Sequence, residues 1–467
     1  MDVVQENIDE LNATLSIKVT PEDYEPRVKK ILNDYQKKAT MPGFRPGKVP
    51  FGMIRKMYGT SVLADELNKM LVDELYKHID ENKLPVLGNP LPKEDDNNNN
   101  DIETQKEFDF KYDLALAPKF DINLTEKDKF TKYKIIIDDE LINKYTKDIA
   151  KRYGKVGEGD VADETTMVSG EFQELDKDGN IVEGGISHTS TVAIEYIEDK
   201  KIQKEFVGFK KEDTLTVDPE KVSKGPSDMA AMLNISKAKA EKLKAKFKFT
   251  VKHIYKVEPA EINAELWDKA FGPGNVKSED EFKMRISEEL ERAFAEDSDR
   301  FLKKQVAETL MDKLKLNLPD EFLKRWLLET NKEKLNSEKI EEEYPEYAKS
   351  LRWQLIENKL IENNTIKVTA EEATQRAKDL FKQQMASYGY GDVDDEQLNE
   401  AAKNILGKEE DAKRIYEDLM DRKVIDFMKN TLTLKDKELS FDEFVKLASG
   451  KAAKGKILDK IGNLVKF

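Results

Sequence analysis

The sequence predicts an elongated α+β protein made of several domains. Its 467 residues suggest about three domains, on a prior of roughly 150 residues each. Charged residues make up 37 % of the chain and hydrophobic residues 38 %, so the surface is large relative to the cores. Strand-like alternation occurs before Pro259, and helix signals dominate after it. We therefore expect an N-terminal α/β domain, a central antiparallel β domain and a large all-α C-terminal domain.

The first predicted domain covers residues 1–118, and residues 119–150 are predicted to be a linker with one strand and one helix. Apolar and polar side chains alternate in the first strand, and Thr20-Pro21 has the residue types of a helix start. Pro85, Gly88, Pro90 and Pro92 end the helices, before the polar segment 93–101. The expected strand, helix, loop, helices and strand cover about residues 13–19, 20–39, 41–50, 51–83 and 108–116.

The central domain is predicted over residues 151–257. Strands are expected near 168–175, 215–217 and 247–251, with a hairpin turn at Asp176–Asn180 and a helix near 228–245. Residues 154–159 (GKVGEG) lack the Lys-Ser/Thr ending of a phosphate-binding loop, so we interpret them as a turn. His253 continues the Phe247, Phe249 and Val251 face, so we expect a packed sheet histidine.

The third domain is predicted over residues 258–467. Ser278-x-x-Glu281, Thr369-x-x-Glu372 and Ser440-x-x-Glu443 are capping boxes, which satisfy the free N–H groups of a first helical turn. Helices are expected over about 279–316, 319–336, 343–362, 369–388, 409–430 and 441–449. A tail rich in Gly and Lys follows, for which we favour disorder and solubility over weak contact with RNA or clients.

Reaction chemistry is not indicated. The chain has no Cys, and its three His (His78, His188 and His253) are far apart, so we expect no metal site and no cofactor. The GxSxG motif of hydrolases is absent, and the many carboxylates single out no acid–base pair. No apolar run approaches the roughly 18 residues of a membrane span, so no membrane partner is expected.

Residues 41–50 (MPGFRPGKVP) lie in a stretch without acidic residues. No Asp or Glu occurs from Tyr35 to Ala64, although 94 of 467 residues are acidic and the net charge is −15. Glycines and prolines fix a loop that presents Phe44, Arg45 and Lys48. One interpretation is a solvated turn in which Phe44 fills the gap between two helices. The other is a binding loop, whose aromatic ring stacks and whose cations contact phosphates or carboxylates.

The same loop carries a resemblance to a known family. Gly43-Phe44-Arg45-Pro46-Gly47-Lys48-Val49-Pro50, followed by Ile54 and Tyr58-Gly59, resembles the ribosome-docking motif of bacterial trigger factors, GFRxGKxP and then YG. The expected domain order is also similar to that family's docking domain, FKBP-like domain and helical C-terminal domain with arms. The resemblance implies a ribosome-associated chaperone that docks at the exit tunnel and shelters nascent polypeptides in a helical cradle.

The resemblance also implies partners and site residues. Ribosome binding falls on Gly43, Phe44, Arg45, Gly47 and Lys48, with large-subunit RNA and an exit-site ribosomal protein as partners. Nascent polypeptides are the expected clients, and a weak homodimer off the ribosome is a further expectation. Soft or amphipathic side chains suit varied clients. The candidates for this role are Met284, Met385, Tyr388 and Tyr390.

The central domain departs from the family pattern. FKBP-like isomerases carry a stretch such as IPGFE, whose aromatic ring lies over the substrate proline. Here Ile202 is followed by QKEFVGF, so the Pro-Gly-Phe is missing. Ile202, Phe206 and Phe209 are the pocket candidates, although a buried edge explains the two rings equally well. We predict an FKBP-like fold with weak or absent peptidyl-prolyl isomerase activity.

Two alternatives remain open at this stage. One is an FKBP-type peptidyl-prolyl cis-trans isomerase with accessory domains. The other is a periplasmic chaperone of related helical architecture. The sequence shows no basic head and apolar core of a secretory signal, and its lack of Cys suits a reducing compartment. We therefore expect a cytoplasmic protein.

Overall fold

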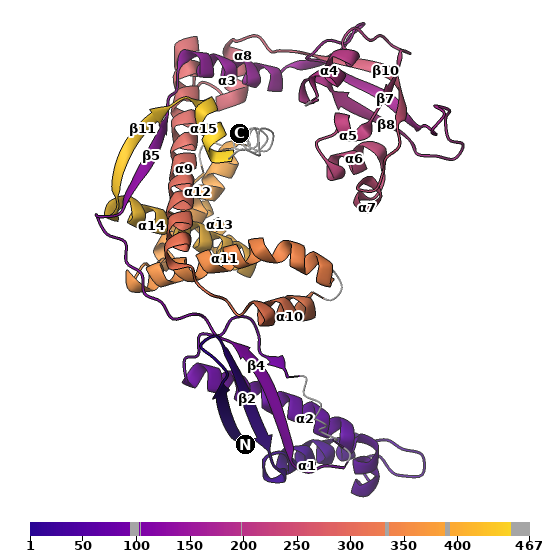
Figure 1. Ribbon diagram of the computed structural model, residues 1–467, viewed down its shortest axis with the longest axis vertical. Helices are drawn as coiled ribbons and strands as arrows, with labels where there is room; N and C mark the ends of the chain where they lie inside the picture. Colours follow the sequence, from indigo (N-terminus) through magenta and orange to yellow (C-terminus); the bar gives the residue numbers. More distant parts are fainter. Residues whose placement is uncertain (94–101, 103, 198, 332–335, 388–392, 450–467) are drawn as a thin grey trace. The chain divides into compact units, whose positions relative to one another are not determined.

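The computed structural model describes residues 1–93, 102, 104–197, 199–331, 336–387 and 393–449 (Figure 1). The chain forms two compact units, each assembled from separate stretches of sequence. Unit 1 contains Met1–Thr131, Phe301–Thr369 and Glu417–Lys435; unit 2 contains Lys132–Arg300, Ala370–Tyr416 and the described residues from Asp436 onward. An N-terminal α/β part, a central β part and a helical remainder are all present, so the predicted fold class is confirmed.

Unit 1 begins with a four-stranded antiparallel sheet in the order β1-β2-β4-β3. Every second residue of β2, from Ala13 to Val19, is at most 1 % exposed, as the alternating pattern predicted. These side chains pack against Leu67, Met70 and Leu71 of α2, so helices cover one sheet face. The elements are β1 (Asp2–Asn7), β2 (Asn12–Val19), α1 (Pro21–Lys38), α2 (Phe51–Glu81), β3 (Leu91–Pro92) and β4 (Phe108–Ala115).

The remainder of unit 1 is mainly helical. α10 (Asp320–Thr330) and α11 (Ser337–Asn363) lie within it, together with the second part of α9 (Glu279–Leu314) and of α14 (Glu409–Thr431). Apolar positions of α9, α11 and α14 form one buried cluster that includes Val306, Ile356 and Val424, whereas Phe322 and Leu323 of α10 belong to a second cluster. The Lys303 ammonium is bonded to the Glu357 carboxylate at 2.6 Å and to that of Asp421, so an ion-pair network joins α9, α11 and α14.

Unit 2 contains the second large sheet, which is antiparallel with the order β6-β10-β7-β8, while β9 also pairs with β10. Phe172, Phe247 and Phe249 fill its core. The strands are β6 (Lys155–Glu158), β7 (Met167–Glu174), β8 (Ser187–Ala193), β9 (Thr214–Val217) and β10 (Phe247–Glu258). Short helices accompany them: η1 (Ile194–Tyr196), α4 (Lys200–Phe206), α5 (Pro219–Val222), α6 (Pro226–Leu233) and α7 (Lys237–Ala240).

Further helices complete unit 2, and a pair of strands forms a small separate sheet. The helices are α3 (Asp139–Arg152), α8 (Ala264–Phe271), the first parts of α9 and α14, α12 (Ala370–Ser387), α13 (Asp395–Leu406) and α15 (Phe441–Ser449). The strands β5 (Lys129–Ile135) and β11 (Thr433–Leu439) form the two-stranded sheet. Within the described residues no helix is long and apolar enough to cross a membrane, and no group of three or more acidic or histidine side chains is arranged to hold a metal ion.

Three local predictions for the central domain are wrong. The expected turn at residues 154–159 is mostly strand β6, which pairs with the end of β10. A β-bulge between Val251 and His253 shifts the alternation by one, so Ile254 is buried and the His253 side chain is exposed. The helix expected over 228–245 divides into α6 and α7, because Asn234 takes a left-handed conformation with φ of 52°.

The C-terminal predictions are largely confirmed. Helices begin within a few residues of the expected starts at 279, 319, 369, 409 and 441, and α11 begins at Ser337 rather than near 343. The Ser278 and Ser440 hydroxyls accept from the backbone N–H of Glu281 and Glu443, and both glutamates accept in return near the cap. α13 was not predicted, and the tail beyond residue 449 lies outside the described residues.

Candidate docking loop

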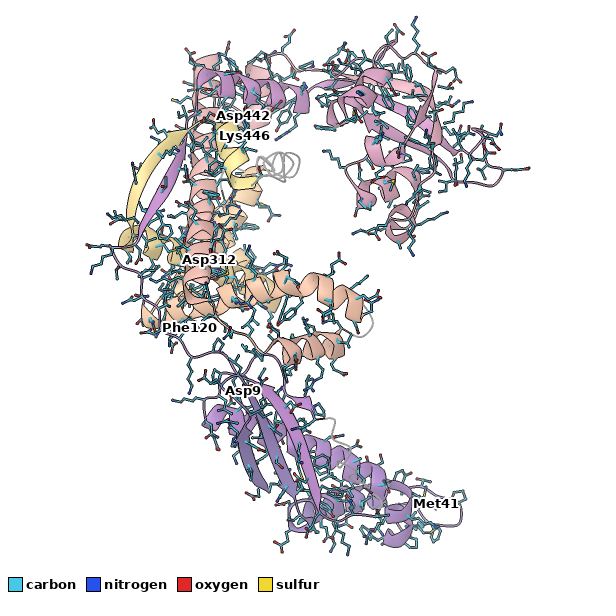
Figure 2. All side chains as sticks on the ribbon, in the orientation of Figure 1. Asp9, Met41, Phe120, Asp312, Asp442 and Lys446 are labelled. Carbon is cyan, nitrogen blue, oxygen red and sulfur yellow. The ribbon has the colours of Figure 1, made fainter. Side chains whose placement is uncertain are left out.

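Residues 39–50 connect α1 to α2 at one end of the N-terminal α/β part of unit 1; Figure 2 labels Met41 in this loop. Val49 and Ile54 are completely buried and pack with Leu32 of α1 and Val62 of α2. This small apolar cluster closes the space between the helices beneath the loop. Phe44 is therefore not needed to fill that space.

The loop backbone is held by short-range hydrogen bonds. Phe44 N–H donates to the Met41 carbonyl at 3.1 Å, Lys48 N–H to the Arg45 carbonyl at 2.9 Å, and Gly47 N–H to the Ala39 carbonyl at 3.1 Å. Gly47 has a φ of +73°, and a Cβ atom there would lie 2.9 Å from the Lys37 carbonyl oxygen. Glycine is thus required at position 47 by conformation and by space.

The predicted binding side chains lie at the exposed end of this loop. Phe44 is 38 % exposed, and both Arg45 and Lys48 are exposed. Among the residues that the structure describes, neither cation has a carboxylate within 4 Å. Gly43, Phe44, Arg45, Gly47 and Lys48 are therefore brought together in one turn-rich loop, as the sequence predicted, whereas their binding role stays a prediction.

The residues around the loop carry an excess of positive charge, although the Asp34 carboxylate lies close to one of the lysines. The Lys37 ammonium lies 2.9 Å from the Asp34 carboxylate and holds the pKa of that carboxyl below its usual range. This pair removes Lys37 from the local excess of positive charge. The remaining cations of the acid-free stretch are Lys38, Arg45, Lys48, Arg55 and Lys56.

The candidate isomerase residues lie in unit 2 around α4. Asp199 caps this helix by accepting from Lys201 N–H, and the Gln203 side-chain amide donates to the Ile194 carbonyl at 2.9 Å. Phe206 has no exposed surface, and its ring centre lies 5.7 Å from that of Phe249. Ile202 and Phe209 are half-buried against the same core. Phe206 therefore has the environment of a core residue.

Two of the candidate client-binding residues, Met284 and Met385, lie on helices of unit 2. Met284 of α9 is 54 % exposed, and Met385 of α12 is half-buried. Tyr388 and Tyr390 fall outside the described residues. Sequence reasoning missed other exposed methionines, Met53 and Met57, one turn apart on α2. It also missed the Gln36 amide beneath the loop, and no sequence signal distinguishes that residue from other polar positions of α1.

Three family models together match most of the chain. Residues 1–149 match the family model "Bacterial trigger factor protein (TF)". Residues 157–259 match "Probable trigger factor, FKBP-like domain", and residues 298–448 match "Probable trigger factor, C-terminal domain". All three parts of the chain are thus similar to parts of the same kind of protein, in the same order.

Similar full-length proteins agree with these matches. Trigger factor from Pelagibacter ubique is 25 % identical over 80 % of this chain and 75 % of its own length. Trigger factor from Chlorobaculum parvum is 24 % identical over 78 % of this chain and 84 % of its own length. Trigger factor from Francisella tularensis subsp. mediasiatica is 27 % identical over 70 % of this chain and 70 % of its own length. A solved structure, reported as "Promiscuous Substrate Recognition in Folding and Assembly Activities of the Trigger Factor Chaperone", covers 92 % of this chain and 99 % of its own at 16 % identity and a TM-score of 0.41.

The fold and the matches define the class first: a modular chaperone with an N-terminal α/β domain, an FKBP-like domain and a helical C-terminal domain. Within that class, the chain belongs to the trigger factor family. Ribosomes and nascent polypeptides are therefore its partners at the level of the family.

Proposed function

We propose that this chaperone docks on the ribosome through residues 43–48, with Phe44, Arg45 and Lys48 in direct contact. The observation that carries the proposal is the held loop, which projects an aromatic ring and two cations without a carboxylate neighbour within 4 Å in the described chain. Arg45 and Lys48 suit the phosphates of large-subunit RNA, and Phe44 suits a base or an apolar pocket of an exit-site ribosomal protein.

The size and charge of the loop set the expected strength of docking. A contact made by a few side chains buries little surface, and phosphate contacts weaken as salt displaces them. We therefore expect reversible, salt-sensitive binding. Because the whole chain has a net charge of −15, the rest of the surface should be repelled by RNA and should not compete with the loop.

The test is co-sedimentation with ribosomes at low salt. A variant with Phe44→Ala, Arg45→Ala and Lys48→Ala should lose pelleting. The matched control is Tyr196→Ala, Lys210→Ala and Lys211→Ala, which removes one exposed aromatic ring and two exposed cations from the FKBP-like domain. This control should pellet as the wild type does. Equal pelleting of the loop variant and the wild type would refute the docking assignment.

The FKBP-like domain is proposed to be a weak or inactive isomerase. Its candidate aromatic residue Phe206 is fully buried among Phe172, Phe247 and Phe249, so a substrate proline cannot reach the ring without a rearrangement of the core. Isomerisation requires twisting an amide whose barrier is about 18–20 kcal/mol, and this needs a preformed apolar pocket. A protease-coupled tetrapeptide assay should show turnover far below that of an ordinary FKBP. Comparable turnover would favour the alternative function, an isomerase with accessory domains.

Client contact is proposed for Met284 and Met385, whose flexible thioether side chains adapt to varied apolar segments. The exposure of Met284 supports its part in this proposal.

A weak homodimer off the ribosome is also proposed, since a cationic loop on an acidic chain can contact a second copy. We also expect the protein to be located in the cytoplasm.

A further inference from the structure

One hydrogen bond that holds the docking loop comes from a side chain outside it. The Gln36 Nε2 atom on α1 donates to the Val49 carbonyl oxygen at 2.7 Å, across 13 residues of sequence. Gln36 is half-buried and Val49 is completely buried, so water competes poorly for this bond. The Val49 carbonyl lies directly before Pro50, the N-cap residue of α2.

A second attachment lies two residues earlier in the same loop. Gly47 N–H donates to the Ala39 carbonyl at 3.1 Å, and Gly47 packs closely on the Lys37 carbonyl. Residues 47 and 49 are therefore both fixed to the last turn of α1, and Lys48 lies between them. Lys48 N–H donates to the Arg45 carbonyl at 2.9 Å. The attachment of residues 47 and 49 to α1 therefore also fixes the position of Arg45.

We infer that Gln36 is a positioning residue for ribosome docking: it holds residues 47–49 of the loop so that the Lys48 and Arg45 side chains are presented together. The inference rests on the proposed docking function. Gln36 acts through Val49 and needs no contact with the ribosome. A loop that is already ordered loses less conformational freedom when it binds, so loss of this bond should lower affinity without removing any charge.

The first experiment measures the loop itself, in the full chain and without ribosomes. Gln36→Met keeps the length of the side chain but removes the donor, while Gln36→Lys keeps a donor of sufficient reach. Amide hydrogen exchange at residues 47–48 should be roughly tenfold faster in Gln36→Met, since one net hydrogen bond corresponds to about that factor. Gln36→Lys should restore slow exchange. Asn33→Met, the same kind of change on the same helix, should leave exchange unchanged.

The second experiment measures ribosome binding by co-sedimentation at several salt concentrations. Gln36→Met should bind about three- to tenfold more weakly than the wild type, with the same slope of log affinity against log salt, because no phosphate contact is lost. Wild-type exchange and wild-type binding in Gln36→Met would overturn the inference, as would equal losses in Gln36→Met and Asn33→Met. If exchange changes but the Phe44/Arg45/Lys48 variant still pellets, the docking proposal fails, and the role of Gln36 in docking fails with it.

Discussion

Two short segments of this chain contain similar residues and have opposite environments. Residues 43–48 (GFRPGK) and 206–211 (FVGFKK) each combine aromatic, glycine and basic residues, and each bends at a glycine with positive φ. Phe44 is 38 % exposed, whereas Phe206 has no exposed surface. The difference comes from the neighbours. Val49 and Ile54 already close the core beneath Phe44, while Phe206 is itself part of a core, with its ring centre 5.7 Å from that of Phe249. The same residue types are thus exposed at the end of a loop in one segment and buried in a core in the other.

The largest expected effect follows from this contrast. Phe206→Ala should lower the free energy of unfolding of the FKBP-like domain by about 3–5 kcal/mol, because it leaves a cavity among packed rings. Phe44→Ala should change stability by no more than about 0.5 kcal/mol. Urea denaturation followed in the full chain tests both variants. A Phe206→Ala variant as stable as the wild type would show that Phe206 is not a core residue. Phe206 would then again be a candidate for a substrate pocket.

Charged side chains also differ between the exposed loop and the interior of the protein. Arg45 and Lys48 of the loop are exposed to water. In contrast, burial raises the pKa of Glu289 on α9 from its ordinary 4.5 to about 7, against the opposing effect of Arg292 and Arg285. Between these two values the folded protein binds the proton more tightly than the unfolded chain does, so stability should fall as pH rises from about 4.5 to 7.

Glu289→Gln should therefore stabilise unit 2 at pH 8, on the order of 1–3 kcal/mol, and have little effect at pH 4. Thermal unfolding of both proteins at the two pH values provides the measurement. Lys56→Gln in the acid-free stretch is the control, and should show no such dependence on pH. An equal response of the Glu289 variant at both pH values would contradict the assigned burial effect.

The smallest expected difference is the one between two glycines of the docking loop. Both have positive φ, but a Cβ atom at Gly43 would meet nothing within 4 Å, while one at Gly47 would meet the Lys37 carbonyl. Gly43→Ala should cost about 1 kcal/mol of conformational strain, and Gly47→Ala about 1–3 kcal/mol, with weaker ribosome binding. Urea denaturation and co-sedimentation test this order. If Gly43→Ala proves the more harmful variant, the loop is not fixed at position 47 in the way described.

Sequence patterns predicted elements best where one period dominated. The alternation at residues 13–19 and the capping boxes at Ser278 and Ser440 depend on neighbours within a few residues, so they are visible in the chain itself. His253 was misplaced because a one-residue bulge reverses every side chain after it, and the bulge depends on pairing with β7. β6 was missed because its four residues become a strand only by pairing with β10.

The candidate site divides in the same way. The motif at 43–48 identified the loop, and the family resemblance supplied its expected role. Neither could identify Gln36, whose partner Val49 is 13 residues away, nor the buried state of Phe206. The domain limits at 118, 150 and 257 stay predictions, and the two compact units join stretches of sequence that lie far apart in the chain.

The sequence by itself determined most of the element types, the acid-free loop and the resemblance to trigger factors, because residue types, local periods and motifs act over short distances. Only the tertiary structure decided which aromatic rings are exposed, which cations lack a carboxylate neighbour among the described residues and which side chain holds the loop. These properties depend on residues that meet through folding, such as Val49 with Ile54 and Phe206 with Phe249. Exposure and fixed geometry therefore require the packed structure, even where the motif is plain in the sequence.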